Sequence, residues 1–287
     1  MRSSSNGWTE ARSLTAGSVF DLDKHEVIAG VRAQRDRTIE LLRDLPAADW
    51  EREIVPRWRV REVAGHLVAS DEGVLTGRIA TAGFTKRGDL ALSKIEVWND
   101  KQAARWADRP IPEILKGLDV WARRIERLSK VVPSFVSRPA LPTPFGRVSL
   151  LWLTSVRIYD EWVHNEDMRR VFAMPSDDAP SVVKPVARQI HAGIPVQTLP
   201  RVHDNAKGRV VLAFEDVQLP LMGVDLGART FGYGVETADA RVTGRAGTIT
   251  MIAARRDAWR DVERTGGLKI EGDRTAAESF LEALLLV

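Results

Sequence analysis

The sequence contains no cysteine among its 287 residues, and this absence removes several kinds of chemistry. Disulfides, thiolate metal ligands, iron–sulfur clusters and a cysteine nucleophile are all excluded. Thiol chemistry in this protein would therefore need a thiol borrowed from another molecule. The sequence also lacks any stretch close to the roughly 18 uninterrupted apolar residues of a membrane span, so we do not expect an integral membrane protein.

The chain also lacks a large excess of either positive or negative charge. The chain has 42 Lys and Arg against 39 Asp and Glu, a formal net charge of +3, and acidic residues interrupt its basic runs. Although the pI is 9.3, a nucleic-acid binder would need clustered basic residues, so this class is the weakest alternative. Residues 1–21 are polar and lack the apolar core of a signal peptide, which favours a poorly ordered tail and a cytoplasmic protein.

Helical periodicity dominates the first two thirds of the chain. Apolar residues recur at helical spacing in four long segments, the third of them interrupted by Pro110 and Pro112: residues 24–45, 60–80, 93–131 and 148–172. Long amphipathic segments with modest connections predict an antiparallel four-helix bundle.

The pattern changes after about residue 200. Short β-rich runs bounded by glycine follow there, at residues 208–214, 229–235, 240–244 and 267–273. A closing helix is expected over residues 275–286, while residues 248–254 fit either a strand or a helix. We therefore expect a polar tail (1–21), a helical domain with the functional site (22–199) and a small α+β domain (200–287). The helical stretch 180–199 fits either domain.

Histidines are scarce, with five in the chain, so they limit where a metal could bind. A carboxylate four residues before a histidine puts both side chains on one helix face, a known chelating arrangement. The spacing occurs in the pairs Asp21–His25, Glu62–His66 and Asp160–His164. Because Asp and Glu are frequent, the spacing alone carries little information, and a surface ion pair remains an alternative for each pair.

The segment 148–172 carries a more informative pattern. Arg157, Asp160, His164 and Asp167 are spaced so that they span an arc of about 80° on a helix. Such a polar stripe either faces solvent, with an Arg157–Asp160 ion pair, or lines an internal site. On the segment 60–80, His66 has small residues on its own side, which leaves room for a ligand or for a closely packed helix.

Three stretches and the C-terminal region resemble a known family. WRVREVAGHL (58–67) and RIYDEWVHNED (157–167) resemble the two signatures of the mycothiol-dependent maleylpyruvate isomerase family, which belongs to the DinB-like metal-binding four-helix bundles. EVWNDKQAARWADRPIPEIL (96–115) resembles the helix between them. Residues 240–259 and 268–284 are similar to the family's sterol-carrier-protein-like C-terminal domain. The resemblance implies this fold over nearly the whole chain.

The resemblance also implies a site. His66, Asp160 and His164 correspond to the family's metal ligands, usually for zinc, although Asp160 replaces a glutamate and is one methylene shorter. This change leaves the identity of the divalent metal open. Arg157 and Asp167 would orient the ligands through hydrogen bonds.

The sequence gives weaker support for functional roles of other residues. Trp58 and Trp162 lie next to the signatures and could form walls of the pocket. Glu62 is a weaker candidate for orienting a ligand. The remaining histidines have no motif support, and core or surface positions are expected for them: His25, His191 and His203.

Three protein ligands leave an open coordination position, which is typical of catalytic rather than structural zinc. In the resembled isomerases the thiolate of mycothiol adds to a cis double bond, the resulting single bond rotates, and elimination releases the trans isomer. The same thiolate could serve S-transfer or thiol exchange instead. A non-enzymatic protein that binds an apolar ligand in its C-terminal domain is the main alternative class.

The sequence leaves the substrate contacts and the oligomeric state open. A dicarboxylate substrate would need cationic anchors, and four arginines are candidates, although solvated surface roles are expected for them: Arg78, Arg229, Arg255 and Arg256. The expected partners are a small-molecule substrate and a low-molecular-weight thiol, with no nucleic acid or membrane. A monomer or a homodimer would fit.

Overall fold

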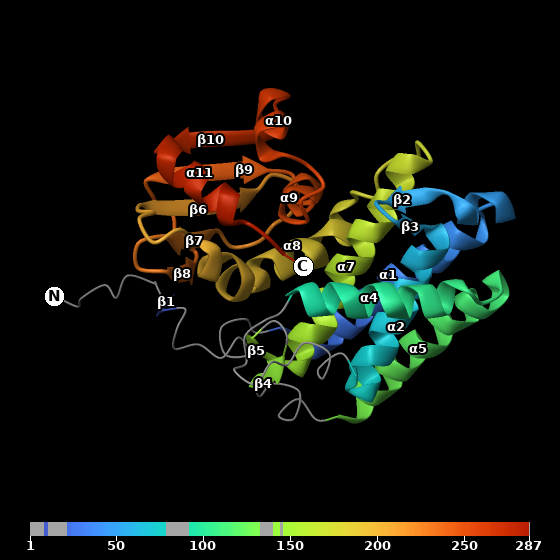
Figure 1. The fold of residues 1–287 in the computed structure, drawn as a ribbon. Coiled ribbons are helices and arrows are strands. Elements are labelled where there is room, and N and C mark those ends of the chain that lie inside the picture. Colours follow the sequence, from blue (N-terminus) through green and yellow to red (C-terminus); the bar gives the residue numbers. More distant parts are fainter. Residues whose placement is uncertain (1–8, 11–21, 79–91, 133–139, 144–145, 287) are drawn as a thin grey trace. The chain divides into compact units, whose positions relative to one another are not determined.

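The helices expected from the sequence are present in the computed structural model, which describes residues 9–10, 22–78, 92–132, 140–143 and 146–286 (Figure 1). In the first part of the chain they are α1 (Lys24–Arg43), α2 (Val60–Thr76), α4 (Leu92–Ala107), α5 (Ile111–Val131) and α7 (Leu150–Val171). The break between α4 and α5 falls at Pro110, as predicted. Pro112 lies in the first turn of α5, where the missing N–H costs no helical hydrogen bond.

Local capping interactions fix where these helices begin. The Asp23 side chain accepts a hydrogen bond from the backbone N–H of Glu26 (2.9 Å) at the start of α1. Ser149 accepts one from the backbone N–H of Trp152 (3.0 Å) at the start of α7. Each cap satisfies a backbone donor that has no partner within the helix. The two helices therefore start at definite residues, which fixes the residues that each one turns inward.

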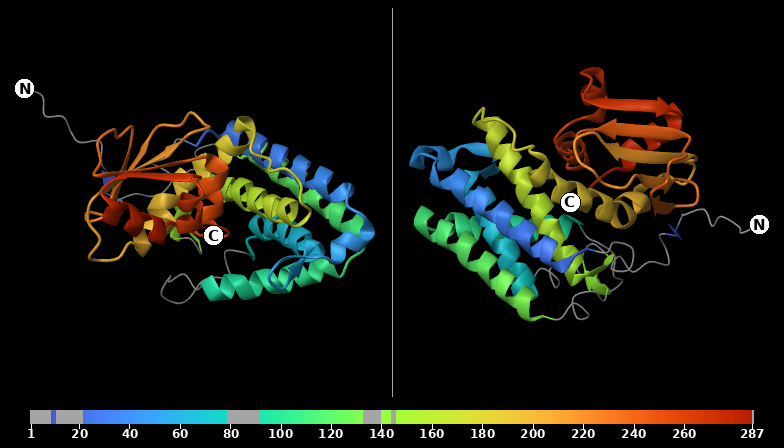
Figure 2. Two further views of the ribbon diagram at one scale, coloured as in Figure 1. Left: turned by 90° about the horizontal axis from the view of Figure 1, so that it is seen from above. Right: turned by 180° about the vertical axis from the view of Figure 1, so that it is seen from behind.

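One apolar core joins the helices of this region. Buried side chains from α1, α2, α4, α5 and α7 contribute to it, together with Trp50 from a short 3-10 helix at Ala47–Glu51. Helix α4 packs closely on α2, because Gly65 of α2 faces the backbone carbonyl of Ala103 and the side chain of Trp106. Figure 2 shows these helices from two further directions.

Two short hairpins flank the helices. Strand β2 (Glu53–Val55) pairs antiparallel with β3 (Trp58–Arg59), and Arg57 in the turn has a φ of 72°. Strand β4 (Ala140–Thr143) pairs with β5 (Gly146–Ser149), directly before α7. The first hairpin delivers Trp58 to the beginning of α2, close to His66 in sequence.

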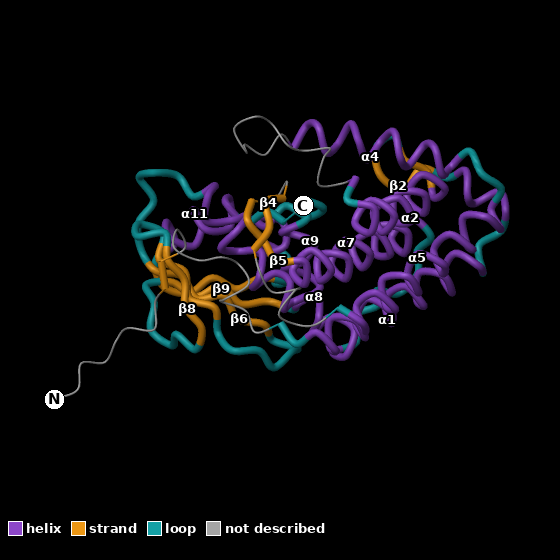
Figure 3. Tube along the Cα trace, turned by 90° about the horizontal axis from the view of Figure 1, so that it is seen from below, coloured by secondary structure: helices purple, strands orange, loops and turns teal. Residues whose placement is uncertain are grey.

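The C-terminal part contains the main sheet, drawn in orange in Figure 3. Its strand order is β1-β8-β7-β6-β9-β10. The strands are β1 (Thr9–Glu10), β6 (Arg209–Phe214), β7 (Met222–Asp225), β8 (Thr230–Tyr233), β9 (Ala240–Gly244) and β10 (Leu268–Gly272). Neighbouring strands are antiparallel except for β6 and β9, which are parallel. Four of these strands match the expected β-rich runs.

In the C-terminal part, the structure shows which element forms where the sequence pattern fitted either a strand or a helix. The ambiguous residues 248–254 fall mainly in helix α9 (Ala246–Ala253). The expected closing helix is α11 (Arg274–Ala283), capped by Asp273, and it packs on β6, β9 and β10. In the C-terminal part, strand β7 and the short helix α10 (Trp259–Arg264) were not expected.

The chain divides into two compact units. One spans residues 17–176 and is referred to as the helical unit; the other combines residues 1–16 with 177–287 and is referred to as the sheet unit. Helix α8 (Pro180–Gly193) therefore belongs with the sheet, and the division falls earlier than the boundary expected after residue 199.

Most of the expected N-terminal tail, residues 1–8 and 11–21, lies outside the described residues. Thr9 and Glu10 form β1, which pairs with β8 at an edge of the sheet. Among the described residues, no helix is both long and apolar enough to cross a membrane.

Candidate metal centre

Helix α2 holds His66 within the core of the helical unit. At the start of the helix, the Glu62 carboxylate accepts a hydrogen bond from the backbone N–H of Arg59 (2.9 Å). Glu62 also pairs with the Arg59 guanidinium. Its observed contacts are thus those of a helix cap, and His66 lies one turn further along α2.

Helix α7 turns its polar stripe inward. Arg157, His164 and Asp167 are buried, and the Asp160 side chain is 21% exposed. The stripe is therefore not a solvated face, which was the alternative left open by the periodicity. It is part of the interior of the helical unit.

The two helices bring three potential metal ligands together. The Nε2 atom of His66 lies 3.3 Å from Oδ2 of Asp160, and Nε2 of His164 lies 3.6 Å from Oδ1 of the same carboxylate. One ligand atom from each of the three side chains lies within 4.8 Å of the others. Residues 94 positions apart in the sequence thus converge on one point.

The spacing of these atoms fits a divalent cation. Tetrahedral ligands at about 2.1 Å from zinc lie roughly 3.4 Å from one another, close to the two separations seen here. The Nδ1 atom of His164 lies 3.3 Å from Oδ2 of Asp167, so a proton held there leaves Nε2 free to bind a cation. The donor types and the two separations between imidazole and carboxylate atoms therefore fit a divalent cation.

The protonation of the site also favours a cation. Burial, aided by nearby positive charge, lowers the pKa of His66 despite the pull of Asp160, which keeps the imidazole neutral near pH 7. Burial opposes ionisation of Asp160, but the charge of Arg157, together with the contact to His66, lowers the pKa of Asp160 well below the usual range. A neutral His66 imidazole beside an ionised Asp160 carboxylate is the combination of forms that binds a metal.

Charge balance points the same way. The interior around the site contains two guanidinium groups and four carboxylates: Arg35, Arg157, Asp71, Asp160, Glu161 and Asp167. Carboxylates outnumber guanidinium groups among these six side chains. Because negative charge is costly in a protein interior, a divalent cation bound here would add compensating charge.

Three of these charged residues were not identified from the sequence as part of the site. Arg157 contacts Asp71 of α2, Asp71 contacts Arg35 of α1, and Arg35 pairs with Glu161 of α7. Glu161 follows Asp160 on α7 and therefore points about 100° away from it, where it pairs with Arg35. The missed signal is a charged residue at an apolar position: Arg35 follows Val27 and Val31 at four-residue spacing, and Asp71 follows Leu67.

The two tryptophans near the signatures have different positions. The Trp58 ring lies 5.0 Å from the His66 ring and 6.1 Å from the His164 ring, measured between centroids. Its indole N–H donates to Oδ1 of Asp100 on α4 (2.9 Å), which fixes the ring. Trp162 is buried and lies about 200° around α7 from Asp160. Trp58 thus covers one side of both imidazoles.

The other histidines lie apart from this cluster. His191 is buried in the sheet unit, against the rings of Phe214 and Tyr233, and His203 is exposed. His25 is exposed at the start of α1.

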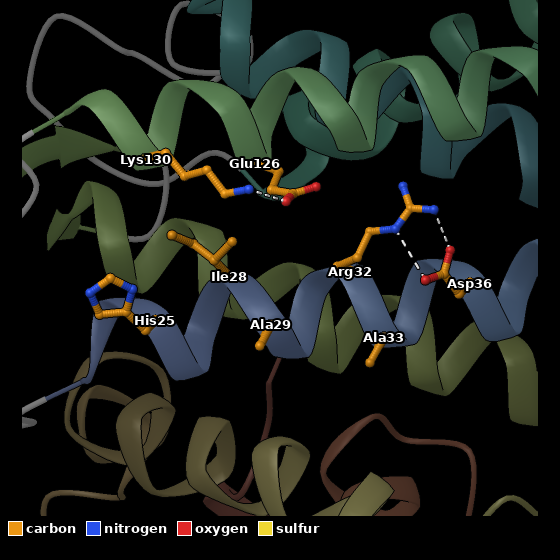
Figure 4. Close-up of a pocket in the computed structure, with 8 residues that line it drawn as sticks. All are labelled: His25, Ile28, Ala29, Arg32, Ala33, Asp36, Glu126 and Lys130. Atoms are coloured by element: carbon orange, nitrogen blue, oxygen red, sulfur yellow. Dashed lines mark hydrogen bonds and ion pairs between the residues drawn. The ribbon is translucent and has the colours of Figure 1, made fainter.

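His25 lines a separate pocket of about 440 Å³ between α1 and α5 (Figure 4). The charged side chains of this pocket are paired, with Arg32 donating to Asp36 (3.1 Å) and Lys130 to Glu126 (2.6 Å). The four charged side chains that line the pocket therefore already have partners.

The four arginines considered as substrate anchors have local partners. Arg78 is exposed near Glu72 of α2, and Arg229 pairs with Asp204. Arg255 donates to the backbone carbonyl of Glu282, and Arg256 to that of Ala254.

Known proteins resemble this chain in sequence and in fold. Residues 31–169 match the family model described as the mycothiol maleylpyruvate isomerase N-terminal domain. An uncharacterised protein of Mycobacterium tuberculosis, from strains H37Rv and CDC 1551, is 24% identical over 241 residues, which cover 82% of this chain and 87% of that protein.

The fold is shared with a crystallised enzyme. The mycothiol-dependent maleylpyruvate isomerase is 14% identical, with a TM-score of 0.54 over 92% of this chain and 97% of that chain. A sterol carrier protein 2-like protein of Aedes aegypti is 20% identical over 35% of this chain, with a TM-score of 0.27. Residues 31–169 therefore form a domain of the mycothiol maleylpyruvate isomerase N-terminal family, within a chain that has the fold of the crystallised isomerase.

Proposed function

We propose that the protein is a metal-dependent enzyme of the maleylpyruvate isomerase type, which uses mycothiol or a similar low-molecular-weight thiol. The observation that carries this proposal is the convergence of His66, Asp160 and His164 in the interior of the helical unit. The family of residues 31–169 supports the choice of thiol. The absence of cysteine fits it, because the nucleophile then comes from the co-substrate.

The proposed ligands are Nε2 of His66, a carboxylate oxygen of Asp160 and Nε2 of His164, with zinc as the expected ion. A divalent cation held there supplies positive charge that stabilises a thiolate over its thiol at neutral pH. Three protein ligands leave room for a further ligand, as in catalytic sites.

The surrounding side chains would prepare the site. Asp167, with Oδ2 3.3 Å from Nδ1 of His164, would favour a proton on that nitrogen and leave Nε2 to face the cation. Arg157 orients the Asp160 carboxylate. Trp58 excludes water from one side of the imidazoles, which strengthens electrostatic interactions at the site.

Metal content tests the site directly. Wild-type protein purified without added metal should contain about one zinc per chain by elemental analysis. His66→Ala and His164→Ala should each lose it, because each removes one of three proposed ligands. His203→Ala, which removes an exposed histidine, should keep it. Full occupancy in both ligand variants would refute the ligand assignment.

Product analysis tests the reaction. The metal-loaded enzyme with mycothiol and maleylpyruvate should release the trans isomer, without net consumption of thiol. S-conjugates formed from an electrophile would instead identify a transferase. No thiol-dependent conversion in a metal-loaded protein would contradict the proposed chemistry.

A further inference from the structure

We propose that Arg35 and Asp71 are positioning residues that control how strongly Arg157 holds Asp160, and that they thereby set the affinity of the site for a divalent cation. The inference rests on the proposed function and extends it to residues that touch none of the three proposed ligands. Its basis is a continuous chain of charged contacts through the helical unit.

Asp71 is the link in this chain, because it contacts two guanidinium groups at once. Its Oδ1 atom accepts a hydrogen bond from Nε of Arg157 (3.1 Å), and its Oδ2 atom lies 2.9 Å from Nη1 of Arg35. Arg157 in turn donates from Nη1 to Oδ2 of Asp160. Asp71 and Asp160 therefore compete for one guanidinium group.

Arg35 is held rigidly on its other side. Its Nε and Nη2 atoms donate to the two carboxylate oxygens of Glu161 (2.6 and 3.0 Å), and Nη1 donates to the carbonyl of Leu118 (2.8 Å). Thr38 donates to Glu161 (2.5 Å) and accepts from Asn165 (3.0 Å). Arg35 and Glu161 are fully buried, so water does not screen these charges.

The competition at Arg157 predicts shifts of opposite sign. Without the charge of Asp71, Arg157 would pair fully with Asp160, neutralise it and weaken its attraction for a cation. Without the charge of Arg35, Asp71 would draw Arg157 more strongly to itself, and Asp160 would be left more negative. A role limited to packing would weaken the site in both cases.

The test is a zinc titration of the full-length protein at pH 7, in competition with a chromophoric chelator. Asp71→Asn, which keeps the shape of the side chain, should raise the zinc dissociation constant about ten-fold or more. Arg35→Gln should lower it several-fold. The matched controls are Asp119→Asn and Arg32→Gln, which break a partly exposed Arg32–Asp119 pair between α1 and α5 (3.2 Å) and should leave the constant unchanged.

Urea unfolding of each metal-free variant shows whether it is folded. If Arg35→Gln does not fold, the zinc dissociation constant of Asp71→Asn alone tests the inference. Equal zinc affinity in folded Asp71→Asn and wild type, or weaker binding in both variants, would overturn this inference and leave the proposed function standing. A wild-type protein that binds no zinc would overturn both.

Discussion

Burial has opposite consequences for His191 and Asp160, because their neighbours differ. His191 is 1% exposed and lies between Phe214 and Tyr233, with ring centroids at 5.1 and 5.4 Å, and burial lowers its pKa to about 3. Asp160 stays ionised because the neighbouring Arg157 guanidinium supplies compensating charge. A buried ionisable group thus keeps its charge only where a partner is provided.

The low pKa of His191 predicts that the sheet unit becomes less stable in mild acid. Above pH 6.5 the imidazole is neutral in both the folded and the unfolded chain, and it contributes no pH dependence. Between pH 6.5 and about 3 the unfolded chain binds a proton that the folded chain does not, so stability falls as the pH falls. At pH 5 the loss should be about 2 kcal/mol.

Hydrogen exchange of β6 and β8 amides at pH 7 and pH 5, corrected for intrinsic exchange rates, measures this loss. His191→Phe should show a smaller loss of protection than the wild type, because phenylalanine has no proton to bind. An equal loss in both proteins would show that other groups cause the acid sensitivity.

Among the helices, the contact between α2 and α4 depends on the absence of a side chain at Gly65. A Cβ atom at this position would lie 2.6 Å from the backbone oxygen of Ala103 and 3.0 Å from Cβ of Trp106. Gly65→Ala should therefore force α4 away from α2 and lower the unfolding free energy by about 1–3 kcal/mol.

Urea unfolding compares this variant with Gly227→Ala, where the nearest atoms to the new methyl group, Ala206 O and Asp225 Oδ1, would lie at 3.8 Å. Gly227→Ala should change stability much less. A Gly65→Ala protein as stable as wild type would show that α4 can move away from α2 without cost. Since α4 carries Asp100, which binds Trp58, the variant should also loosen that ring.

The sequence predicted the helices better than their polar contacts. Periodicity and prolines located α1, α2, α4, α5 and α7, because a helix that packs on one face repeats its apolar residues locally. Strand β7 was missed, since Met222–Asp225 is short and shows no alternation. Residues 248–254 were ambiguous because α9 is buried on nearly all sides, which removes the periodic signal.

In the candidate site too, the sequence did not predict the polar contacts between distant segments. His66, Asp160 and His164 were found because two sequence signatures mark them. Arg35 and Asp71 occupy positions where periodicity expects apolar residues, and only the folded chain shows that they meet. Their pairing links α1 to α2, and such a contact between distant segments has no local signature in one sequence.

For the molecule as a whole, the proposed ligands lie within one of its two units. Helices α2 and α7 both belong to residues 17–176, and binding that favours the folded form protects the region that contains the ligands. Addition of zinc should therefore slow hydrogen exchange in α2 and α7 and leave strands β6–β9 unchanged. His66→Ala should show no such protection. Equal protection of the sheet would reveal energetic coupling between the units.

The pairing of Glu10 with Thr230 has a consequence for how the protein is made. On a ribosome, the strand at residues 9–10 emerges early, and the whole helical unit is synthesised before its partner strand appears. The helical unit can thus complete its core while β1 is still without its partner strand β8. A truncation that removes Thr9 and Glu10 would leave the outer side of β8 without a hydrogen-bonded neighbour, and free strand edges promote aggregation.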